Sequence, residues 1–505
     1  MGLGSQEGHG AGETLFPQGD RGLHPGHSGT HDDDAALSLF RLLAHADQPN
    51  HLTFHQEQAR GRQPYPACAP GLVWPPYLSR ESGRTGLRGR LAGLRPYEPD
   101  PGHAGEGRGW TPMHSSRRGS PKGSDVLVIG GGIIGLVSAW RAARRGLRTV
   151  LADPAPGGGA AQVAAGMLAA VTELHYGEET LLGLNVASAA RYPEFAAELA
   201  EASGGMDIGY RACGTLAVAL DADDRLHLRE LHALQRRCGL ESQWLTGREC
   251  RRLEPMLAPG VRGGLRVDGD HQVDPRRLAA ALLAACERAG VSVHRASAAR
   301  LLVAGDRATG ALLDDGTELG AGQTVLAAGS FSGQLPGVPP EVDIPVRPVK
   351  GQVLRLTVPA PYAPFLSRTV RAVVRGSHVY LVPRENGELV IGATSEELGW
   401  DTTVTAGGVY ELLRDAHELV PGITELPLTE TRAGLRPGSP DNAPLLGPTA
   451  LPGLHLATGH YRNGVLLTPL TGDVMAELLA TGTVPELARP FTPGRFTEAR
   501  QESYA

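Results

Sequence analysis

Three glycines at a fixed spacing are the first residues of this sequence that could support chemistry. Gly130, Gly132 and Gly135 form the pattern Gly-x-Gly-x-x-Gly directly after a short apolar run. Such a turn lets the backbone approach a pyrophosphate, and a helix that begins there offers unpaired N–H groups to the phosphate oxygens. Asp153 follows about 20 residues later, where an acidic side chain accepts hydrogen bonds from a ribose. These four residues predict a dinucleotide-binding site.

The elements that must position these glycines form a strand–helix–strand unit. Residues 126–129 are continuously apolar, which is typical of a parallel strand that is buried on both faces. Helical spacing follows through Ile134, Val137 and Ala142, and a second strand is expected at 148–152. The glycine pattern by itself does not distinguish FAD from NAD.

Further along the chain, helices and strands alternate. We expect a helix at 275–289, strands with a hairpin turn at Asp314–Gly316, and another buried strand that ends in glycine near residue 329. Residues 345–394 are rich in strands, two of which are joined by a turn at 385–387. A helix at 410–420 and a closing strand–glycine turn–helix complete an α/β chain.

Composition excludes several classes of function. The 505 residues carry a formal charge of −6 and no dense Lys/Arg stripe, so nucleic-acid binding is not expected. No apolar run reaches the length of a membrane span, so no membrane role is expected. The five cysteines form no CxxC pair, which argues against a metal site and favours a cytoplasmic location. Residues 1–123, rich in Gly, Pro and His, are expected to be a disordered or low-complexity extension.

From Ser124 to Phe496 the chain resembles a known family, the D-amino-acid-oxidase-like flavoproteins, and within it the glycine oxidases of thiamine biosynthesis. The resemblance rests on separated motifs in a fixed order: VIGGGIIG at 128–135, AAGMLAAVTE at 164–173, VDPRRL at 273–278, VLAAGSFS at 325–332, PVKGQ at 348–352, HVYLVPR at 378–384, GATSEE at 392–397, RAGLRPGSPDNAPLLG at 432–447 and GHYRNGVLLTPLTG at 459–472.

The resemblance implies a two-domain fold. A Rossmann-like FAD-binding domain would be assembled from 124–210, 271–345 and 431–496, the last with the C-terminal helix. A substrate domain with a mixed, largely antiparallel sheet would be assembled from 211–270 and 346–430. The substrate would bind at the flavin face between them.

The resemblance also implies FAD as the cofactor, and noncovalent FAD because no cysteine follows Cys286. Small residues of the AAGM motif would let the backbone pass close to the flavin ring, and the glycine-framed turn at 459–464 would bring N–H groups to it. The expected cofactor contacts are Gly130, Gly132, Ile133, Ile134, Gly135, Asp153, Ala161, Ala165, Gly166, Met167, Leu168, Gly329, His460, Arg462, Asn463, Gly464, Val465 and Leu466.

Four residues are expected to act on the substrate. In the family, the arginine that matches Arg436 holds the substrate carboxylate, for which a guanidinium provides two parallel hydrogen bonds. Tyr380 would donate its hydroxyl to the same carboxylate, and His378 would share its strand face as a catalytic or a rim residue. Arg462 would lie over the flavin edge. Glu396 and Glu397 are expected to form a solvated loop.

The expected activity is oxidative deamination of glycine, or of sarcosine or a small D-amino acid, with molecular oxygen as the acceptor. The product would be the imino acid with hydrogen peroxide, and the resemblance implies hand-over of the imine to thiazole synthase and a homo-oligomer, such as a tetramer. Three alternatives stay open: a sarcosine or D-amino-acid oxidase, a dehydrogenase with another electron acceptor, and a noncatalytic FAD-binding subunit.

Overall fold

A computed structural model describes residues 123–496, except residue 375. The extension expected at 1–123 therefore lies, but for its last residue, outside the described part of the chain. Within the described residues, no helix is both long enough and apolar enough to cross a membrane.

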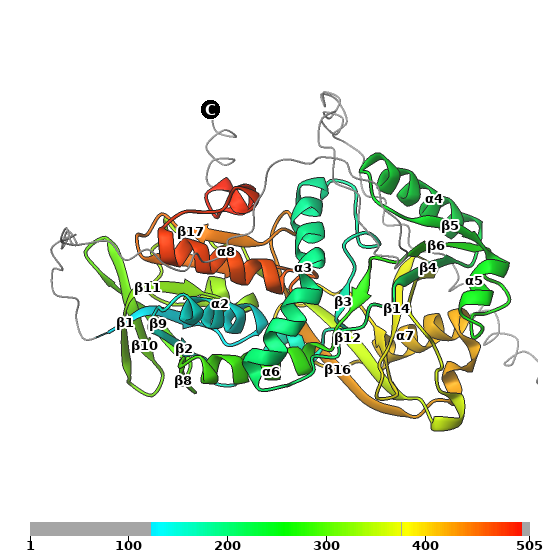
Figure 1. Ribbon diagram of the computed structural model, residues 1–505, viewed down its shortest axis with the longest axis horizontal. Coiled ribbons are helices and arrows are strands. Elements are labelled where there is room, and N and C mark those ends of the chain that lie inside the picture. Colours follow the sequence, from blue (N-terminus) through cyan, green and yellow to red (C-terminus); the bar gives the residue numbers. More distant parts are fainter. Residues whose placement is uncertain (1–122, 375, 497–505) are drawn as a thin grey trace, which may run out of the picture. The chain divides into compact units, whose positions relative to one another are not determined.

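The first sheet contains the predicted strand–helix–strand unit (Figure 1). Its order is β17-β18-β11-β1-β2-β8, and β18, β11, β1, β2 and β8 run parallel. Because parallel strands end at one edge, the segments that follow them meet there. The strands are β1 (Ser124–Ile129), β2 (Thr149–Ala152), β8 (Ser292–His294), β11 (Glu318–Leu326), β17 (Leu445–Pro448) and β18 (Leu454–Thr458), with β9 (Ala298–Ala304) and β10 (Arg307–Leu313) joined at β11.

Strand β1 is buried on both faces, as its continuous apolar run predicts. Val126 and Val128 pack into the core formed with the helices, whereas Leu127 and Ile129 pack into a second core that includes residues of β9 and β10. The helices of the first core are α2 (Ile133–Arg144), α3 (Glu179–Ser203), α6 (Pro275–Arg288) and α8 (Thr468–Thr481).

The second sheet is largely antiparallel, with one parallel pair between β13 and β4. Its order is β16-β12-β15-β14-β13-β4-β6-β5. The strands are β4 (Thr215–Ala219), β5 (Gln243–Thr246), β6 (Gly263–Val267), β12 (Arg347–Thr357), β13 (Thr369–Val374), β14 (Ser377–Pro383), β15 (Glu388–Gly392) and β16 (Leu428–Gly438).

The two faces of the second sheet have different partners. Alternate apolar side chains such as Leu354 and Ile391 pack against helix α7 (Ala406–Leu419). On the opposite face, Val382 and Val390 pack with Ala165, and Tyr380 lies against this cluster. Residue 165 precedes the short strand β3 (Met167–Leu168), which pairs with β7 (His271–Gln272). One face of the second sheet is therefore turned toward the segment that carries the AAGM motif.

These sheets confirm the predicted mixed α/β fold with a mixed, largely antiparallel second sheet. The turns expected at 314–316 and 385–387 join β10 to β11 and β14 to β15. Strand β16 continues the second sheet to Gly438, whereas we expected the substrate domain to end at 430. The domain boundaries as a set stay a prediction.

Two further helices cover the second sheet, α4 (Ala222–Arg237) and α5 (Gly247–Leu253). Helix α3 was not anticipated from the sequence. It contains Pro193, a residue that normally ends or kinks a helix, and its alanine-rich faces give a weak apolar pattern.

Candidate active site

At Gly130 and Gly135, the turn after β1 has no room for a larger side chain. Gly130 has φ +105°, in the region that favours glycine. A Cβ on Gly135 would lie 1.8 Å from the carbonyl oxygen of Gly130. Helix α2 therefore packs directly on the end of β1, as the role predicted for the third glycine requires.

The N-terminus of α2 is open. Gly132 is its N-cap residue, no side chain caps the helix, and no acidic residue occupies the first turn. A Cβ on Gly132 would meet no atom within 4 Å. Among the described residues, no side chain therefore competes for the first N–H groups of α2, which carry the partial positive charge of a helix start, an arrangement that fits a phosphate.

Asp153 is placed directly after β2 and holds the turn. Its Oδ2 accepts a hydrogen bond from the Gly131 N–H at 2.7 Å, and its Oδ1 accepts one from the Ala155 N–H at 2.7 Å. Each carboxylate oxygen has a further lone pair, so Asp153 can also accept hydrogen bonds from a ribose.

Two more predicted segments follow strands at the same edge. Gly329, with φ +56°, comes after β11, and its carbonyl accepts a hydrogen bond from Thr458 at 3.1 Å. The next residue, Ser330, has a buried hydroxyl with no partner among the described residues. A buried hydroxyl without a partner costs free energy, so this atom is suited to a bound polar ligand.

The segment from His460 to Leu466 lies between β18 and α8. Helix α3 fixes its end, because the Tyr192 hydroxyl donates to the Val465 carbonyl and the Ser188 hydroxyl donates to the Leu466 carbonyl at 2.7 Å. His460 is buried, accepts or donates a hydrogen bond with Thr471 at 3.0 Å, and has its pKa lowered to about 3 by burial. Asn463 is also buried, and Gly464 continues the turn.

The AAGM segment approaches from the side of the second sheet. Ala161, Ala165 and Leu168 are buried, and Met167 is half-buried. Gly166 has φ +77°, and a Cβ there would lie 2.0 Å from the Val273 carbonyl oxygen. The backbone conformation therefore requires glycine at position 166.

Together these segments fit FAD. Loops from four strand ends, an uncapped helix start beside Gly132 and the partnerless hydroxyl of Ser330 provide donors for phosphates, and the AAGM segment provides small residues for a flat ring. Individual contacts between the predicted residues and the cofactor stay a prediction.

Arg436 and Tyr380 lie together on the sheet face that is turned toward the AAGM segment. Arg436 is on β16 and crosses Gly351 of β12, where a Cβ would lie 2.3 Å from its Nη1. Tyr380 is on β14 and crosses Gly392 of β15, where a Cβ would lie 2.4 Å from its hydroxyl. The two glycines thus make room for a guanidinium and a phenol side by side.

Arg436 has no carboxylate partner among the described residues. Its Nη1 donates to the carbonyls of Thr394 at 3.1 Å and Lys350 at 3.3 Å, and no ion pair joins it to a described residue. The pKa of Tyr380 is raised mainly by burial, while the adjacent Arg436 acts to lower it. In the described part of the chain, the site therefore offers the guanidinium of Arg436 without a carboxylate partner and, at neutral pH, the neutral hydroxyl of Tyr380.

Arg462, in contrast, is already paired. Its Nη2 contacts the carboxylate of Glu178, and its Nε lies 3.9 Å from that of Glu173. The guanidinium also lies over the ring of Tyr461, 5.3 Å from its centroid. Its predicted place over the flavin edge stays a prediction.

His378 shares the sheet face of Tyr380, as alternation along β14 predicts, and is exposed. Its ring lies 6.3 Å from that of His175, edge to face. Desolvation, followed by the nearby charge of Arg371, lowers its pKa to about 4. His378 is therefore neutral at pH 7 and adds no charge to the site.

Arg371 and the role of Glu173 were not predicted from the sequence motifs. Arg371 lies opposite Tyr380 in the ladder of β13 and β14, donates to the Thr172 hydroxyl at 3.2 Å and pairs with Glu173 at 3.1 Å. Glu173 ends the AAGMLAAVTE motif, so that motif could have indicated it, but no sequence signal marks Arg371. Three arginines therefore lie near the site: Arg371, Arg436 and Arg462. Arg371 and Arg462 have carboxylate partners and share one of them, Glu173.

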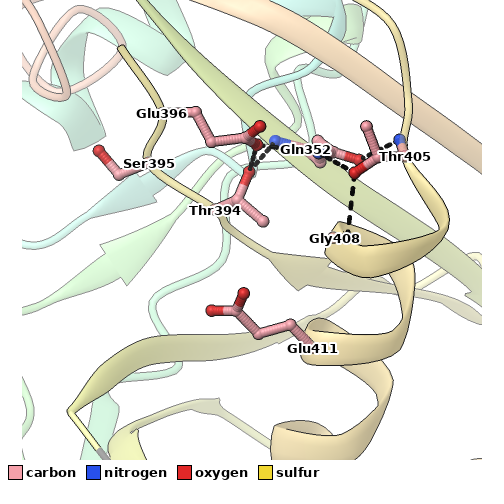
Figure 2. Close-up of a pocket in the computed structure, with 7 residues that line it drawn as sticks. All are labelled: Gln352, Thr394, Ser395, Glu396, Thr405, Gly408 and Glu411. Atoms are coloured by element: carbon pink, nitrogen blue, oxygen red, sulfur yellow. Dashed lines mark hydrogen bonds between the residues drawn. The ribbon is translucent and has the colours of Figure 1, made fainter. Parts of the chain in front are cut away.

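A separate polar cavity of about 240 Å³ lies between β12, the segment after β15 and the start of α7 (Figure 2). Glu396, in its wall, accepts hydrogen bonds from Gln352 at 2.8 Å and from Thr394, and lies 3.4 Å from the Nζ of Lys350. The prediction that Glu396 belongs to a solvated loop is wrong, because the buried Lys350 requires carboxylate partners. Glu397, by contrast, is exposed and pairs with Arg347 at 3.1 Å.

Comparison with known proteins gives one family and several relatives. The model of a family described as DAO, FAD dependent oxidoreductase, matches residues 125–478. A bifunctional protein ThiO/ThiG of Synechocystis sp. is 35% identical over 376 residues, which are 74% of this chain and 54% of that protein. This chain therefore spans about half the length of that relative.

Two further matches span nearly the whole of the related protein. The hydrogen cyanide synthase subunit HcnC of Pseudomonas aeruginosa is 32% identical over 408 residues, covering 74% of this chain and 96% of that protein. The crystal structure of glycine oxidase from Geobacillus kaustophilus is similar with a TM-score of 0.68 and 34% identity, covering 74% of this chain and 98% of that one.

Proposed function

Because this chain belongs to the DAO family of FAD-dependent oxidoreductases and is an FAD-dependent amino-acid oxidoreductase, we propose that glycine is its substrate and molecular oxygen its electron acceptor. Glycine would lose two electrons and two protons to become the imino acid, and oxygen would take them up to become hydrogen peroxide. Bound FAD supplies the acceptor for the hydride that leaves the α-carbon.

The observation that carries this proposal is the unpaired charge of Arg436. A guanidinium that has no carboxylate partner among the described residues, beside the Tyr380 hydroxyl, matches the carboxylate of an amino acid. Arg371 and Arg462 are less suited to this task, because Glu173 and Glu178 already compensate them. Anchored by its carboxylate, a small substrate would be aligned with the AAGM segment, and alignment is the main demand of hydride transfer.

No protein base is assigned to this reaction. Desolvation and the charge of Arg371 lower the pKa of His378, so its imidazole carries no positive charge at neutral pH that would compete with Arg436. The amino group would enter the site in its neutral form. Turnover should therefore rise with pH as more of the substrate amine is deprotonated.

The resemblance to ThiO/ThiG and to glycine oxidase supports a place in thiamine biosynthesis, with the imine handed over to a thiazole synthase. We further propose noncovalent FAD, a homo-oligomer and a cytoplasmic location.

A second candidate function is a dehydrogenase that works as a subunit and passes electrons to another acceptor. The match to a protein named as a hydrogen cyanide synthase subunit, which spans 96% of that protein, favours the subunit part of this candidate. A noncatalytic FAD-binding subunit is less favoured, since a structural flavin site has no need for the unpaired cation of Arg436.

Oxygen uptake with peroxide detection distinguishes these functions. Purified, FAD-loaded protein is given glycine, sarcosine, D-alanine or D-proline. Uptake led by glycine supports the proposal, and uptake led by another substrate replaces glycine. Flavin bleaching without oxygen uptake identifies the dehydrogenase, and no bleaching with any substrate identifies the noncatalytic subunit.

A further inference from the structure

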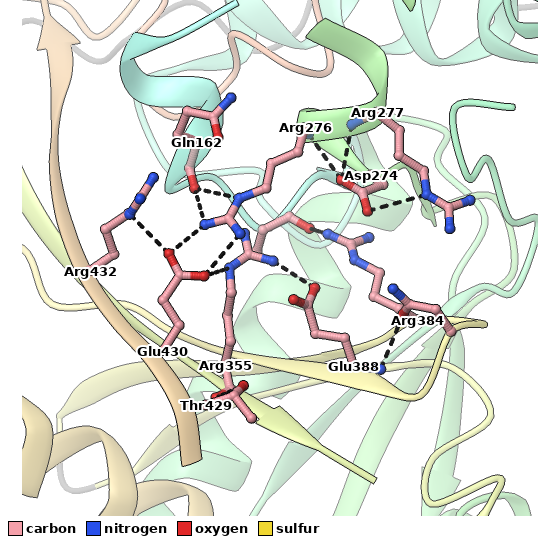
Figure 3. A network of polar contacts seen from close by, with 12 residues as sticks. Gln162, Asp274, Arg276, Arg277, Arg355, Arg384, Glu388, Thr429, Glu430 and Arg432 are labelled. Carbon is pink, nitrogen blue, oxygen red and sulfur yellow. Dashed lines mark hydrogen bonds and ion pairs between the residues drawn. The ribbon is translucent and has the colours of Figure 1, made fainter. Parts of the chain in front are cut away.

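Arg384 is a buried cation whose surroundings differ from those of its neighbours. It follows β14 and is 8% exposed, and no carboxylate of a described residue lies within ion-pair distance of it. Nearby Arg276 and Arg355 have such partners: Arg276 pairs with Glu430 at 2.7 Å, and Arg355 pairs with Glu388 at 2.6 Å (Figure 3). Burial lowers the pKa of Arg384 to about 10, so it stays charged at neutral pH.

The hydrogen-bond partners of Arg384 are neutral oxygens of residues outside the second sheet. Its Nη1 donates to the Val273 carbonyl and to Oε1 of Gln272, each at 2.8 Å, and its Nη2 donates to the Ala165 carbonyl. These three residues adjoin or belong to the small ladder of β3 and β7. A buried guanidinium is costly, and these oxygens are what compensates for its lost hydration.

The guanidinium of Arg384 fixes the orientation of the peptide group between Ala165 and Gly166. In a trans peptide the C=O and N–H groups point in opposite directions, so holding the Ala165 carbonyl toward Arg384 turns the Gly166 N–H away from it. The Gly166 carbonyl is held as well, by the Val273 N–H at 2.9 Å. Two successive carbonyl oxygens, which would repel the electron-rich edge of a reduced flavin, are thus turned into the protein.

Arg276 holds the other end of the same segment. Its Nε and Nη2 donate to the Gln162 carbonyl at 3.0 and 2.9 Å. Arginines therefore hold carbonyls at 162 and 165, the stretch that leads into Gly166 and Met167. Only Arg384 is placed at the peptide next to Gly166, where the backbone has φ +77° and no other residue type fits.

We propose that Arg384 is a positioning residue for FAD: it orients the Ala165–Gly166 peptide so that the segment presents N–H groups and small side chains to the cofactor. The inference depends on the predicted contact between this segment and FAD. It is independent of whether glycine is the substrate, because it concerns cofactor binding alone.

The test compares FAD affinity of variants in the full chain. Apoprotein is titrated into FAD, and quenching of flavin fluorescence gives the Kd, while visible circular dichroism reports the environment of bound flavin. We expect Arg384→Met to raise the FAD Kd at least tenfold. Arg384→Lys keeps the charge but has no planar fork to reach both carbonyls, so we expect a raised Kd and an altered flavin spectrum there too.

Arg368→Lys is the matched control. Arg368, which precedes β13, is half-buried, pairs with Glu254 at 3.2 Å and makes no hydrogen bond to the AAGM segment among the described residues. The FAD Kd of the Arg368→Lys protein should match that of the wild type. An Arg384→Lys protein with wild-type FAD Kd and flavin spectrum would overturn the proposal, even if its melting temperature were lower, because the role of Arg384 would then be structural only.

Discussion

At the level of single residues, the arginines near the site differ in whether a carboxylate compensates their charge. Arg371 and Arg462 share Glu173, and Arg462 also contacts Glu178, so their charges are compensated within the protein. Arg436 donates only to uncharged groups among the described residues. A carboxylate entering the site thus meets one strong, uncompensated attraction, next to the hydroxyl of Tyr380.

Replacing this arginine should weaken substrate binding without loss of cofactor. Arg436→Lys removes the planar fork, and we expect the KM for glycine to rise about tenfold to hundredfold, the size of a hydrogen bond to a charged group. The FAD Kd should stay at the wild-type value. Steady-state oxygen uptake measures the KM, and an unchanged KM would show that the carboxylate is anchored elsewhere.

A methyl group at Gly351 should have a similar effect by another route. In Gly351→Ala the new Cβ would lie 2.3 Å from Nη1 of Arg436, so the guanidinium must move. We expect a raised KM for glycine with little change in the melting temperature. Gly407→Ala, where a Cβ meets no atom within 4 Å, is the matched control and should keep the wild-type KM.

His460 should make the protein less stable in acid. Its folded pKa of about 3 is below the ordinary value of 6.5, so between these values the unfolded chain binds a proton that the native state refuses. Stability therefore falls as pH falls through this window, by up to about 1.4 kcal/mol per pH unit for one site. The free energy of unfolding in urea should fall less steeply with acid in His460→Gln.

Asp270 has the opposite effect on the pH dependence of stability, and it is present in both the wild type and the His460→Gln variant. Burial raises its pKa to about 6, so the native state holds a proton that the unfolded chain releases between about pH 4 and 6. This contribution cancels when wild type and variant are compared. Equal slopes for the two proteins would mean that His460 is not held neutral.

At the scale of elements, the contact between β1 and α2 joins stability to cofactor binding. The third glycine of the motif packs the helix on the strand, and the second leaves open space beside the helix start. The protein itself therefore limits the size of the side chain at position 135. At position 132 we expect only a bound ligand to limit it.

Two alanine substitutions should separate these roles. Gly135→Ala puts a Cβ 1.8 Å from the Gly130 carbonyl oxygen, so we expect a loss of about 1–3 kcal/mol of unfolding free energy together with weaker FAD binding. Gly132→Ala meets no protein atom within 4 Å, so the apoprotein should keep its stability while the FAD Kd rises. Unchanged FAD affinity in Gly132→Ala would place the pyrophosphate elsewhere.

At the scale of the whole described chain, an ion pair helps to join the second sheet to the helices of the first. Arg276, in the first turn of α6, makes two hydrogen bonds to Glu430 of β16, at 2.7 and 2.9 Å, and also holds the Gln162 carbonyl. Glu430 lies 3.8 Å from Arg355 and 2.9 Å from Arg432 as well. One carboxylate thus serves three arginines.

Removing Arg276 should weaken this connection measurably. We expect Arg276→Gln to cost about 1–3 kcal/mol of unfolding free energy, because the pair is partly buried and hydrogen-bonded. Urea unfolding at 50 mM and 500 mM salt measures it, with Arg148→Gln as the control, since Arg148 pairs with Asp125 at the surface. Equal losses in the two variants would mean that the Arg276 pair adds nothing beyond a surface contact.

Elements with local signals could be predicted from the sequence. The apolar run, the glycine spacing and Asp153 predicted β1, the start of α2 and the end of β2, because strand burial and helix starts depend on neighbouring residues. The turns at 314–316 and 385–387 were predicted for the same reason. Family motifs indicated Arg436 and Tyr380, and the structure brings them together.

The pairing of charges, in contrast, could not be predicted from the sequence, because it depends on contacts between distant segments. Arg371, Glu173 and Arg384 contact residues that are distant in sequence, and no local pattern distinguishes a compensated arginine from an uncompensated one. The same holds for Gly351 and Gly392, whose importance comes from side chains on the neighbouring strands. Charge compensation and steric room depend on strand register, which is set when the second sheet assembles from strands at 215–438.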